Sequence, residues 1–128
     1  MSMDETASSD EAGDWTGGRA AILYQRCGAC RNVWYFRREF CPRCGVAGPA
    51  TLEAGGRGTV YAATTVSRAP SEALRARAPY RIVMVDAEEG FRLMAHGAED
   101  LAVGDAVSAR FVAFGALLIP FFDKPAAP

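Results

Sequence analysis

The four cysteines of the chain are the residues whose spacing most directly indicates chemistry. They form two Cys-x-x-Cys pairs, separated by ten residues. Thiolates at this spacing can converge on one point, which is the arrangement of a tetrahedral Zn²⁺ site with four sulfur ligands. A closed site of this kind contributes to folding and keeps no open position for catalysis. We therefore predict one structural Zn²⁺ ion, held by Cys27, Cys30, Cys41 and Cys44.

Residues around both pairs favour the tight turns of metal knuckles, in which backbone N–H groups point at sulfur. Gly28 and Pro42 supply turn-forming residues inside the pairs, and Gly45 follows the second pair, where it is free to adopt φ > 0. Arg31 occupies the corresponding place after the first pair, where glycine would fit more easily. Both pairs therefore contain residues that are typical of metal knuckles, but the first pair is not followed by a glycine.

Three other interpretations of the cysteines stay open at this point. Disulfides would need an oxidising compartment, a thioredoxin-like redox site would need only one pair, and iron would use the same four ligands as zinc. The N-terminus has no charged-then-apolar signal pattern, and no run of 18 apolar residues could cross a membrane. We therefore expect a cytoplasmic protein with reduced, metal-binding cysteines.

Charge is distributed unevenly along this chain of 128 residues, whose net charge is −1. Residues 1–14 carry five acidic side chains and no basic one, so residues 1–18 are expected to form an acidic, disordered tail. Residues 19–43 carry six arginines against the single acid Glu39, a local charge of +5 that coincides with the cysteine segment. Arginine pairs with phosphate better than lysine does. The Ala-, Gly-, Arg- and Pro-rich composition of the chain is, however, also typical of a GC-rich genome.

The remaining sequence is repeatedly strand-like. Apolar or alternating runs occupy 58–66, 80–85, 91–96, 106–112 and 116–119, with Gly-rich turns between them, and an aromatic run over 32–40 suits a hairpin. Residues 46–56 are expected to be a turn-rich joint. The pattern predicts an all-β chain, with a zinc ribbon over 19–50 and a five-stranded OB-type barrel over 51–128. A small sandwich would give a similar pattern.

The chain lacks a recognisable catalytic set. His96 is its only histidine, so no Ser/His/Asp arrangement can be assembled without it. All four cysteines are assigned to the metal, and none remains as a nucleophile. The acidic clusters resemble solvated turns, and Gly55–Gly58 is a weak anion-binding candidate at most. We predict no catalytic residues and no independent enzymatic activity.

Eight motifs follow one another along the chain: Tyr24–Cys30, Cys41–Gly45, Gly56–Tyr61, Arg68–Pro70, Pro79-Tyr80, Glu89–Met94, Val103–Val107 and Ile119–Phe121. In this order they resemble the acyl-CoA-associated family, long called a domain of unknown function, that joins a rubredoxin-like zinc ribbon to an OB-fold. The strand opening at Gly56–Tyr61 and the Pro79-Tyr80 pair at the end of the long Ser67–Pro79 connection make the resemblance specific, and it runs from about residue 15 to 124. The departures are Arg31 in place of glycine and a shortened lead-in before the ribbon.

The resemblance implies a small accessory subunit of a thiolase-type or related CoA-ester enzyme, with acyl-CoA at a shared interface. Arginines beside apolar side chains would suit the phosphates and the pantetheine arm of CoA. An alternative is a single-stranded nucleic-acid-binding protein, since zinc ribbons and OB-folds serve that function too. The pI near 5.8 argues against a dominant phosphate-binding surface. The candidate CoA or partner contacts are Phe36, Arg37, Arg38, Phe40 and Arg68.

Overall fold

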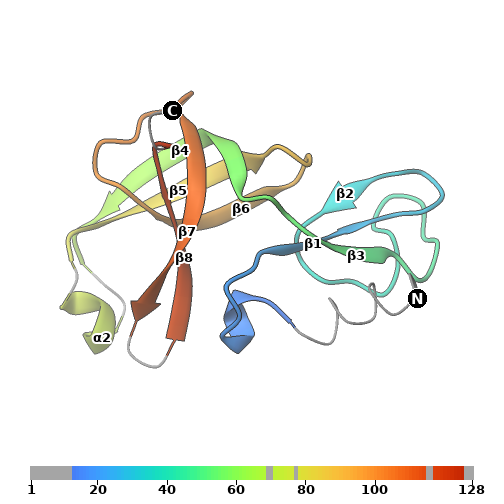
Figure 1. Cartoon of the computed structure of the whole chain (residues 1–128), viewed down its shortest axis with the longest axis horizontal. Helices are drawn as coiled ribbons and strands as arrows, with labels where there is room; N and C mark the ends of the chain where they lie inside the picture. The colour runs from blue at the N-terminus through green and yellow to red at the C-terminus, as the bar shows by residue number, and fades with distance from the viewer. Residues whose placement is uncertain (1–12, 69–70, 77, 115–116, 126–128) are drawn as a thin grey trace.

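The computed structural model describes residues 13–68, 71–76, 78–114 and 117–125, and within them it forms two β-structures that lie side by side (Figure 1). The first is a three-stranded antiparallel sheet of β1 (Leu23–Arg26), β2 (Val33–Trp34) and β3 (Ala50–Glu53), in the order β2-β1-β3. The central strand β1 pairs with β2 through Gln25 and Trp34, and with β3 through Gln25 and Thr51. This sheet carries the cysteine segment and is called the ribbon below.

The second structure is a closed five-stranded barrel. Its strands are β4 (Arg57–Val66), β5 (Tyr80–Ala87), β6 (Arg92–Gly97), β7 (Ala106–Phe114) and β8 (Leu117–Asp123), in the order β4-β5-β6-β8-β7. All neighbours are antiparallel except β6 and β8, which run parallel. The all-β fold class and the five-stranded barrel predicted from the sequence are confirmed.

Side-chain alternation explains why these segments form a barrel. In β6, Leu93 and Ala95 are buried while Arg92 and Met94 face outward, which is the period-two pattern of a strand with one buried face. In β5, Val83 and Val85 are fully buried at the barrel centre. The side chain of Leu101, in the connection between β6 and β7, joins the same core.

Three expectations about the strands need correction. The predicted joint over 46–56 contains β3, which forms because the Leu23–Arg26 edge of β1 offers it a full antiparallel ladder. The aromatic run forms only the two-residue strand β2, because Tyr35 turns away to stack on the barrel residue Phe91. The last strand does not end before Pro120 but continues to Asp123, with Pro120 in register opposite Phe111 of β7.

Helical structure is limited to two short turns in the described residues: the 3₁₀ turn η1 (Trp15–Gly17) and the four-residue helix α2 (Glu72–Arg75). Asp14 caps η1 by accepting a hydrogen bond from the backbone N–H of Thr16. No helix in the described ranges is long and apolar enough to span a membrane. Residues 1–12, which make up most of the predicted acidic tail, are not among the residues that the structure describes. The domain limits drawn from the sequence stay a prediction.

The ribbon and the barrel share one hydrophobic core. Phe91, which precedes β6, lies between Tyr24 and Tyr35 of the ribbon, with ring centroids 4.9 Å and 5.6 Å away and nearly parallel rings. In the connection between the two structures, the backbone N–H of Gly55 donates to the Glu89 carboxylate at 2.8 Å. Ile22, which precedes β1, and Tyr24 of β1 pack in the same buried cluster as the barrel valines.

Candidate metal centre and adjoining surface

The four cysteines that the sequence assigns to a metal lie together at one end of the ribbon. Their Sγ atoms all lie within 4.8 Å of one another. Across the two knuckles, the Sγ of Cys27 lies 3.5 Å from that of Cys44, and the Sγ of Cys30 lies 3.6 Å from that of Cys41. A disulfide would need about 2.05 Å, and all four cysteines are free. The first cysteine of each pair is buried and the second is exposed.

Backbone N–H groups point at the first sulfur of each knuckle, as the turn residues predicted. Cys27 Sγ accepts from the N–H groups of Ala29 and Cys30, at 3.3 Å and 3.4 Å. Cys41 Sγ accepts from those of Arg43 and Cys44 at the same two distances. These hydrogen bonds stabilise the thiolate form of the two buried cysteines.

The two knuckles close with the same turn but with different residues. After the first pair, the N–H of Arg31 donates to the carbonyl of Cys27 at 3.1 Å; after the second pair, the N–H of Gly45 donates to that of Cys41 at 2.9 Å. Both donors have positive φ, 66° for Arg31 and 81° for Gly45. Arg31 is the only described residue other than glycine with positive φ. The strain expected at this position is therefore present in the fold.

Hydrogen bonding and charge set the acidity of the thiols. The pKa of Cys27 is lowered, chiefly by the N–H of Cys30. Burial opposes ionisation of Cys41, but the N–H groups of Cys44 and Arg43 outweigh it and lower the pKa of Cys41 to about 6. The Val46 N–H acts to lower the pKa of Cys44, yet the neighbouring sulfurs and burial raise it to about 12. A cation among the four sulfurs would relieve this crowding of negative charge.

The geometry fits one tetrahedral metal ion. Four ligands at a Zn–S distance of about 2.3 Å lie about 3.8 Å from one another, close to the observed sulfur separations. Four thiolate ligands suit zinc or iron, whereas magnesium and calcium prefer oxygen ligands. A tetrahedral ion bound here would have a sulfur at each of its four coordination positions and none left for a substrate.

An aromatic and arginine-containing loop, residues 35–40, follows β2 beside the cysteines. Its backbone is held by Gln25 of β1, whose side-chain oxygen accepts hydrogen bonds from the indole N–H of Trp34 and the backbone N–H of Arg38, both at 2.7 Å. The Gln25 side-chain nitrogen points at the Thr51 hydroxyl at 3.5 Å. The loop does not continue the β1–β2 ladder beyond Trp34. The hydrogen bonds of the buried Gln25 side chain fix its course instead.

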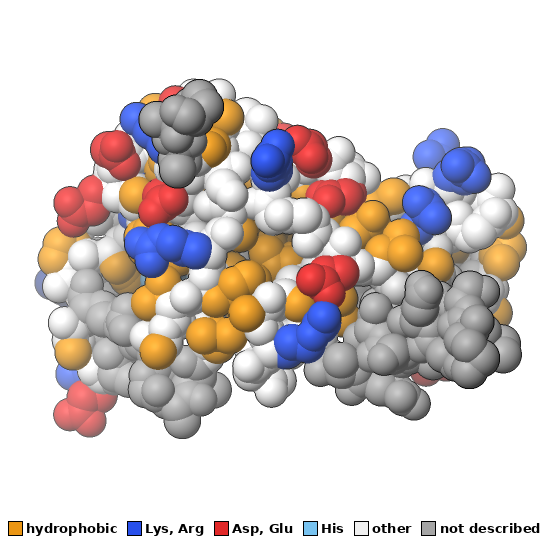
Figure 2. Space-filling view, viewed as in Figure 1, with side chains coloured by type: hydrophobic (Ala, Val, Ile, Leu, Met, Phe, Trp, Pro, Cys, Tyr) orange, Lys and Arg blue, Asp and Glu red, His pale blue; other side chains and the backbone are white. Residues whose placement is uncertain are grey.

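The loop presents its predicted contact residues to solvent. Phe36 is 77% exposed and Phe40 is 56% exposed, and both arginines between them are exposed. Figure 2 shows Lys and Arg side chains gathered at the ribbon end of the molecule, with hydrophobic side chains beside them. The structure does not bring Arg68 to this surface. It follows β4 at the end opposite the ribbon, on the side of the barrel where α2 lies (Figure 1).

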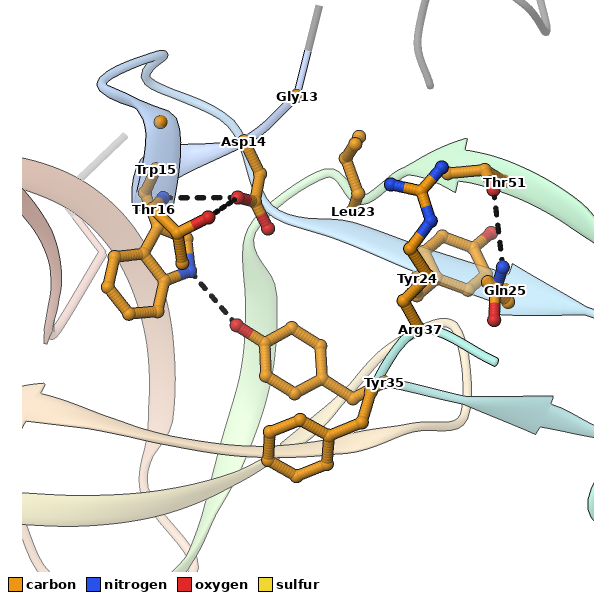
Figure 3. Close-up of a pocket in the computed structure, with 12 residues that line it drawn as sticks. Gly13, Asp14, Trp15, Thr16, Leu23, Tyr24, Gln25, Tyr35, Arg37 and Thr51 are labelled. Atoms are coloured by element: carbon orange, nitrogen blue, oxygen red, sulfur yellow. Dashed lines mark hydrogen bonds between the residues drawn. The ribbon is translucent and has the colours of Figure 1, made fainter. Parts of the chain in front are cut away.

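Beside the loop lies a cleft that the sequence analysis missed. It has a volume of ≈ 400 Å³ and lies between η1, the centre of β1 and the start of the loop. Its aromatic wall is fixed, since the indole N–H of Trp15 donates to the Tyr35 hydroxyl at 2.9 Å (Figure 3). Trp15 and Tyr35 are twenty residues apart, so no local pattern relates them. The one available signal was Gln25, a polar residue at the end of an apolar run.

The single histidine of the chain lies on a strand of the barrel, whereas the cysteine cluster lies in the ribbon. His96, on β6, packs edge-on against the ring of Tyr80 on β5, with centroids 4.9 Å apart. In the described residues, the cluster of four cysteines is the only group of three or more His, Cys, Asp or Glu that could hold a metal ion.

Two family models match this chain in succession. Residues 15–50 match the rubredoxin-like zinc ribbon domain of ChsH2, and residues 52–112 match the C-terminal OB-fold domain of ChsH2. A DUF35 domain-containing scaffold protein of Methanocaldococcus jannaschii is 32% identical over 98 residues, an alignment that spans 73% of this chain and 69% of that protein. The chain belongs to the DUF35 family. The predicted resemblance and the combination of zinc ribbon and OB-fold are confirmed.

Two further relatives of this DUF35 chain are informative. A solved structure described as an Ltp2-ChsH2(DUF35) aldolase is 28% identical, with a TM-score of 0.73, over 88% of this chain and 92% of that one. A probable enoyl-CoA hydratase alpha subunit of Thermomonospora curvata is 34% identical over 73 residues. That alignment spans 57% of this chain but only 22% of the hydratase subunit.

Proposed function

We propose that this chain is a non-catalytic scaffold subunit of a thiolase-like or related CoA-ester-processing enzyme complex. The observation that carries the proposal is the likeness to the DUF35 chain of an Ltp2-ChsH2(DUF35) aldolase over nearly its whole length. The scaffold protein and the probable hydratase subunit among its relatives support the same class of role. The chemistry of the complex would then reside in the partner subunit.

The four cysteines hold one structural Zn²⁺ in this proposal. Zinc is favoured over iron because the ribbon matches a zinc ribbon family model. The knuckle hydrogen bonds orient the two buried sulfurs, and the exposed sulfurs complete the tetrahedron. Metal analysis of the chain purified without added metal should give one zinc per chain. A dominant iron content, or no metal in a folded chain, would contradict the assignment.

The loop over 35–40 forms the docking surface for the partner or its bound acyl-CoA in this proposal. Exposed Phe36 and Phe40 offer apolar area, and Arg37 and Arg38 offer positive charge on a rigid base. Aromatic and arginine side chains are the types that dominate protein interfaces. Arg68 lies at the other end of the barrel, so it would contact a separate part of the complex.

Co-expression with a thiolase-like subunit encoded beside this chain tests the function. Wild-type chain should co-purify with that subunit and support its turnover of acyl-CoA, and the chain alone should show none. The variant Arg37→Glu with Arg38→Glu should lower recovery of the complex or raise the KM for acyl-CoA, with zinc content unchanged. The control is Arg57→Glu with Lys124→Glu, which makes the same change of net charge on the barrel, away from Arg68. If both double variants assemble and turn over like wild type, the docking surface lies elsewhere.

A further inference from the structure

We propose that the N-terminal segment of this chain, residues 1–12, binds to an exposed arginine surface of the ribbon and shields it from other polyanions. The arginine surface consists of Arg26, Arg31, Arg38 and Arg43. The contact goes beyond the proposed function, because its occupant comes from within the chain. Three observations carry it: the unpaired positive charge of the ribbon, the carboxylates of the segment, and the place at which the segment joins the fold.

The arginine surface concentrates positive charge that the described part of the fold does not neutralise. All four of its side chains are exposed. The ion pairs among the described residues use other basic side chains, and no member of the arginine surface takes part in one. Over residues 19–43 the only acidic side chain is Glu39. Figure 2 shows Lys and Arg side chains gathered at this end of the molecule, so the ribbon presents a cationic surface without a counter-charge among its described neighbours.

Arg31 is held at this surface at a conformational cost. It is the only described residue other than glycine with positive φ, and Gly45 closes the equivalent turn of the second knuckle. A glycine would make the same turn without strain, so the knuckle itself does not need the side chain of Arg31. Backbone strain at a single position points to a role for its side chain. An exposed guanidinium group is suited to an anionic contact.

The N-terminal segment carries the complementary charge. Residues 1–12 contain four carboxylates and no basic side chain, and the carboxylates are those of Asp4, Glu5, Asp10 and Glu11. The other residues of the segment are mostly small or polar, so it offers little apolar surface for a core of its own. Carboxylates pair with guanidinium groups through charge-assisted hydrogen bonds. The segment is therefore a suitable counter-charge for the arginine surface.

The fold delivers this segment to the ribbon. Its attachment point is fixed, because the Arg19 guanidinium group donates to the Gly13 carbonyl at 3.1 Å and pairs with Glu53 of β3 at 2.6 Å. Gly13 lines the same cleft as Leu23 of β1 (Figure 3). From Leu23 to Arg26, at the end of β1, the distance is about 10 Å at the rise of a strand. Twelve residues can span up to about 40 Å, so the segment can reach the arginine surface.

Attachment to the ribbon makes weak contacts sufficient. A single exposed ion pair contributes little to binding in water. A short flexible connection, however, gives the segment an effective concentration in the millimolar range at the surface. A competing polyanion must displace the segment, and its apparent affinity falls in proportion to the fraction of time that the surface is open.

Two full-length variants with the same net charge separate a direct contact from general electrostatics. Each converts four carboxylates to amides and leaves the cysteines and the arginine surface unchanged. The tail variant carries Asp4→Asn, Glu5→Gln, Asp10→Asn and Glu11→Gln. The barrel variant changes exposed carboxylates and carries Glu72→Gln, Glu88→Gln, Glu99→Gln and Asp100→Asn.

The first measurement is NMR of the zinc-loaded full chain. The signals to follow are the backbone N–H and guanidinium Nε–H of Arg31, Arg38 and Arg43. The tail variant should shift these signals, and the barrel variant should leave them in place. Raising the salt concentration from about 50 to about 200 mM should move the wild-type signals toward their tail-variant positions, because salt screens exposed charges.

The second measurement is binding of single-stranded oligothymidylate, used as a polyanion probe. The tail variant should bind it about tenfold more tightly than wild type, the factor expected if the segment covers the surface about nine-tenths of the time. The barrel variant should gain less than about threefold, because charges more than a Debye length of about 8 Å away are largely screened.

Three results would overturn the contact. The first is unchanged arginine signals in the tail variant, which would leave this surface for an anionic group of a partner. The second is an equal gain in oligothymidylate affinity in both variants, which would show an effect of net charge alone. The third is equal affinity of wild type and tail variant, with or without measurable binding. None of the three bears on the proposed function, whose test is co-purification with a thiolase-like subunit.

Discussion

Replacing Gln25 tests whether one buried side chain holds the docking loop. Gln25→Leu removes the oxygen that accepts from the Trp34 indole and the Arg38 backbone N–H, each at 2.7 Å. A hydrogen bond of this kind contributes about 0.5–1.5 kcal/mol net. The two together predict a loss of about 1–3 kcal/mol in the free energy of unfolding.

Gln25→Glu is the matched control, because it keeps an acceptor for both donors and removes only the amide N–H that points at the Thr51 hydroxyl. We expect it to retain most of the loop order, although burial of a carboxylate opposes it. Thr51→Val removes that longer contact alone and should have a smaller effect than Gln25→Leu.

Amide hydrogen exchange at Arg38 in the zinc-loaded chain is the direct measurement. A local loss of about 1.4 kcal/mol would speed exchange there by about tenfold. Exchange at the core strand β5 should change only with global stability. Unchanged exchange at Arg38 in Gln25→Leu would show that the loop does not depend on this side chain. Equal acceleration in Gln25→Glu would show that an acceptor oxygen at this position is not enough to hold the loop.

Three further predictions concern the metal site and the core. Arg31→Gly should relieve the positive-φ strain of the first knuckle and raise stability by up to about 1 kcal/mol, whereas Gly45→Ala should lower it by a similar amount, both measured by denaturant unfolding. Zinc should be retained at neutral pH and released on acidification, because protons compete with the metal for the four thiolates; a chromogenic chelator would report this. Phe91→Ala should cost about 3–5 kcal/mol in the free energy of unfolding. In the wild-type chain, ribbon and barrel signals should be lost in a single transition, and separate transitions there would refute a shared core.

The sequence predicted those features that depend on local spacing. The cysteine pairs identified the metal cluster, and the β-branched run over 58–66 identified β4, because ligand spacing and period-two alternation are local properties. β3 was missed because Ala50–Glu53 lies between glycines and becomes a strand only through its partner β1. Strand pairing between distant segments overrides such weak local preferences.

The adjoining surface was predicted only in part. The mixture of arginine and aromatic residues over 32–40 suggested contact residues on a hairpin, and in the structure Phe36 and Phe40 are exposed on a loop. That this loop contacts CoA or a partner stays a prediction. The cleft could not be predicted, because its wall depends on residues from three separate parts of the chain. Trp15 donates a hydrogen bond to Tyr35, and Tyr35 stacks on Phe91.

The position of Phe91 between two ribbon tyrosines limits how this protein can be dissected or recombined. A ribbon excised after residue 50 would lose Thr51–Glu53 of β3 and would expose the faces of Tyr24 and Tyr35 that Phe91 covers. The remaining barrel would in turn expose Phe91. Chimaeras that exchange ribbons among relatives should therefore fold only when the acceptor barrel brings an aromatic ring to this position. The ribbon and the barrel match separate family models, but the packing at Phe91 requires that they be kept together when either is exchanged.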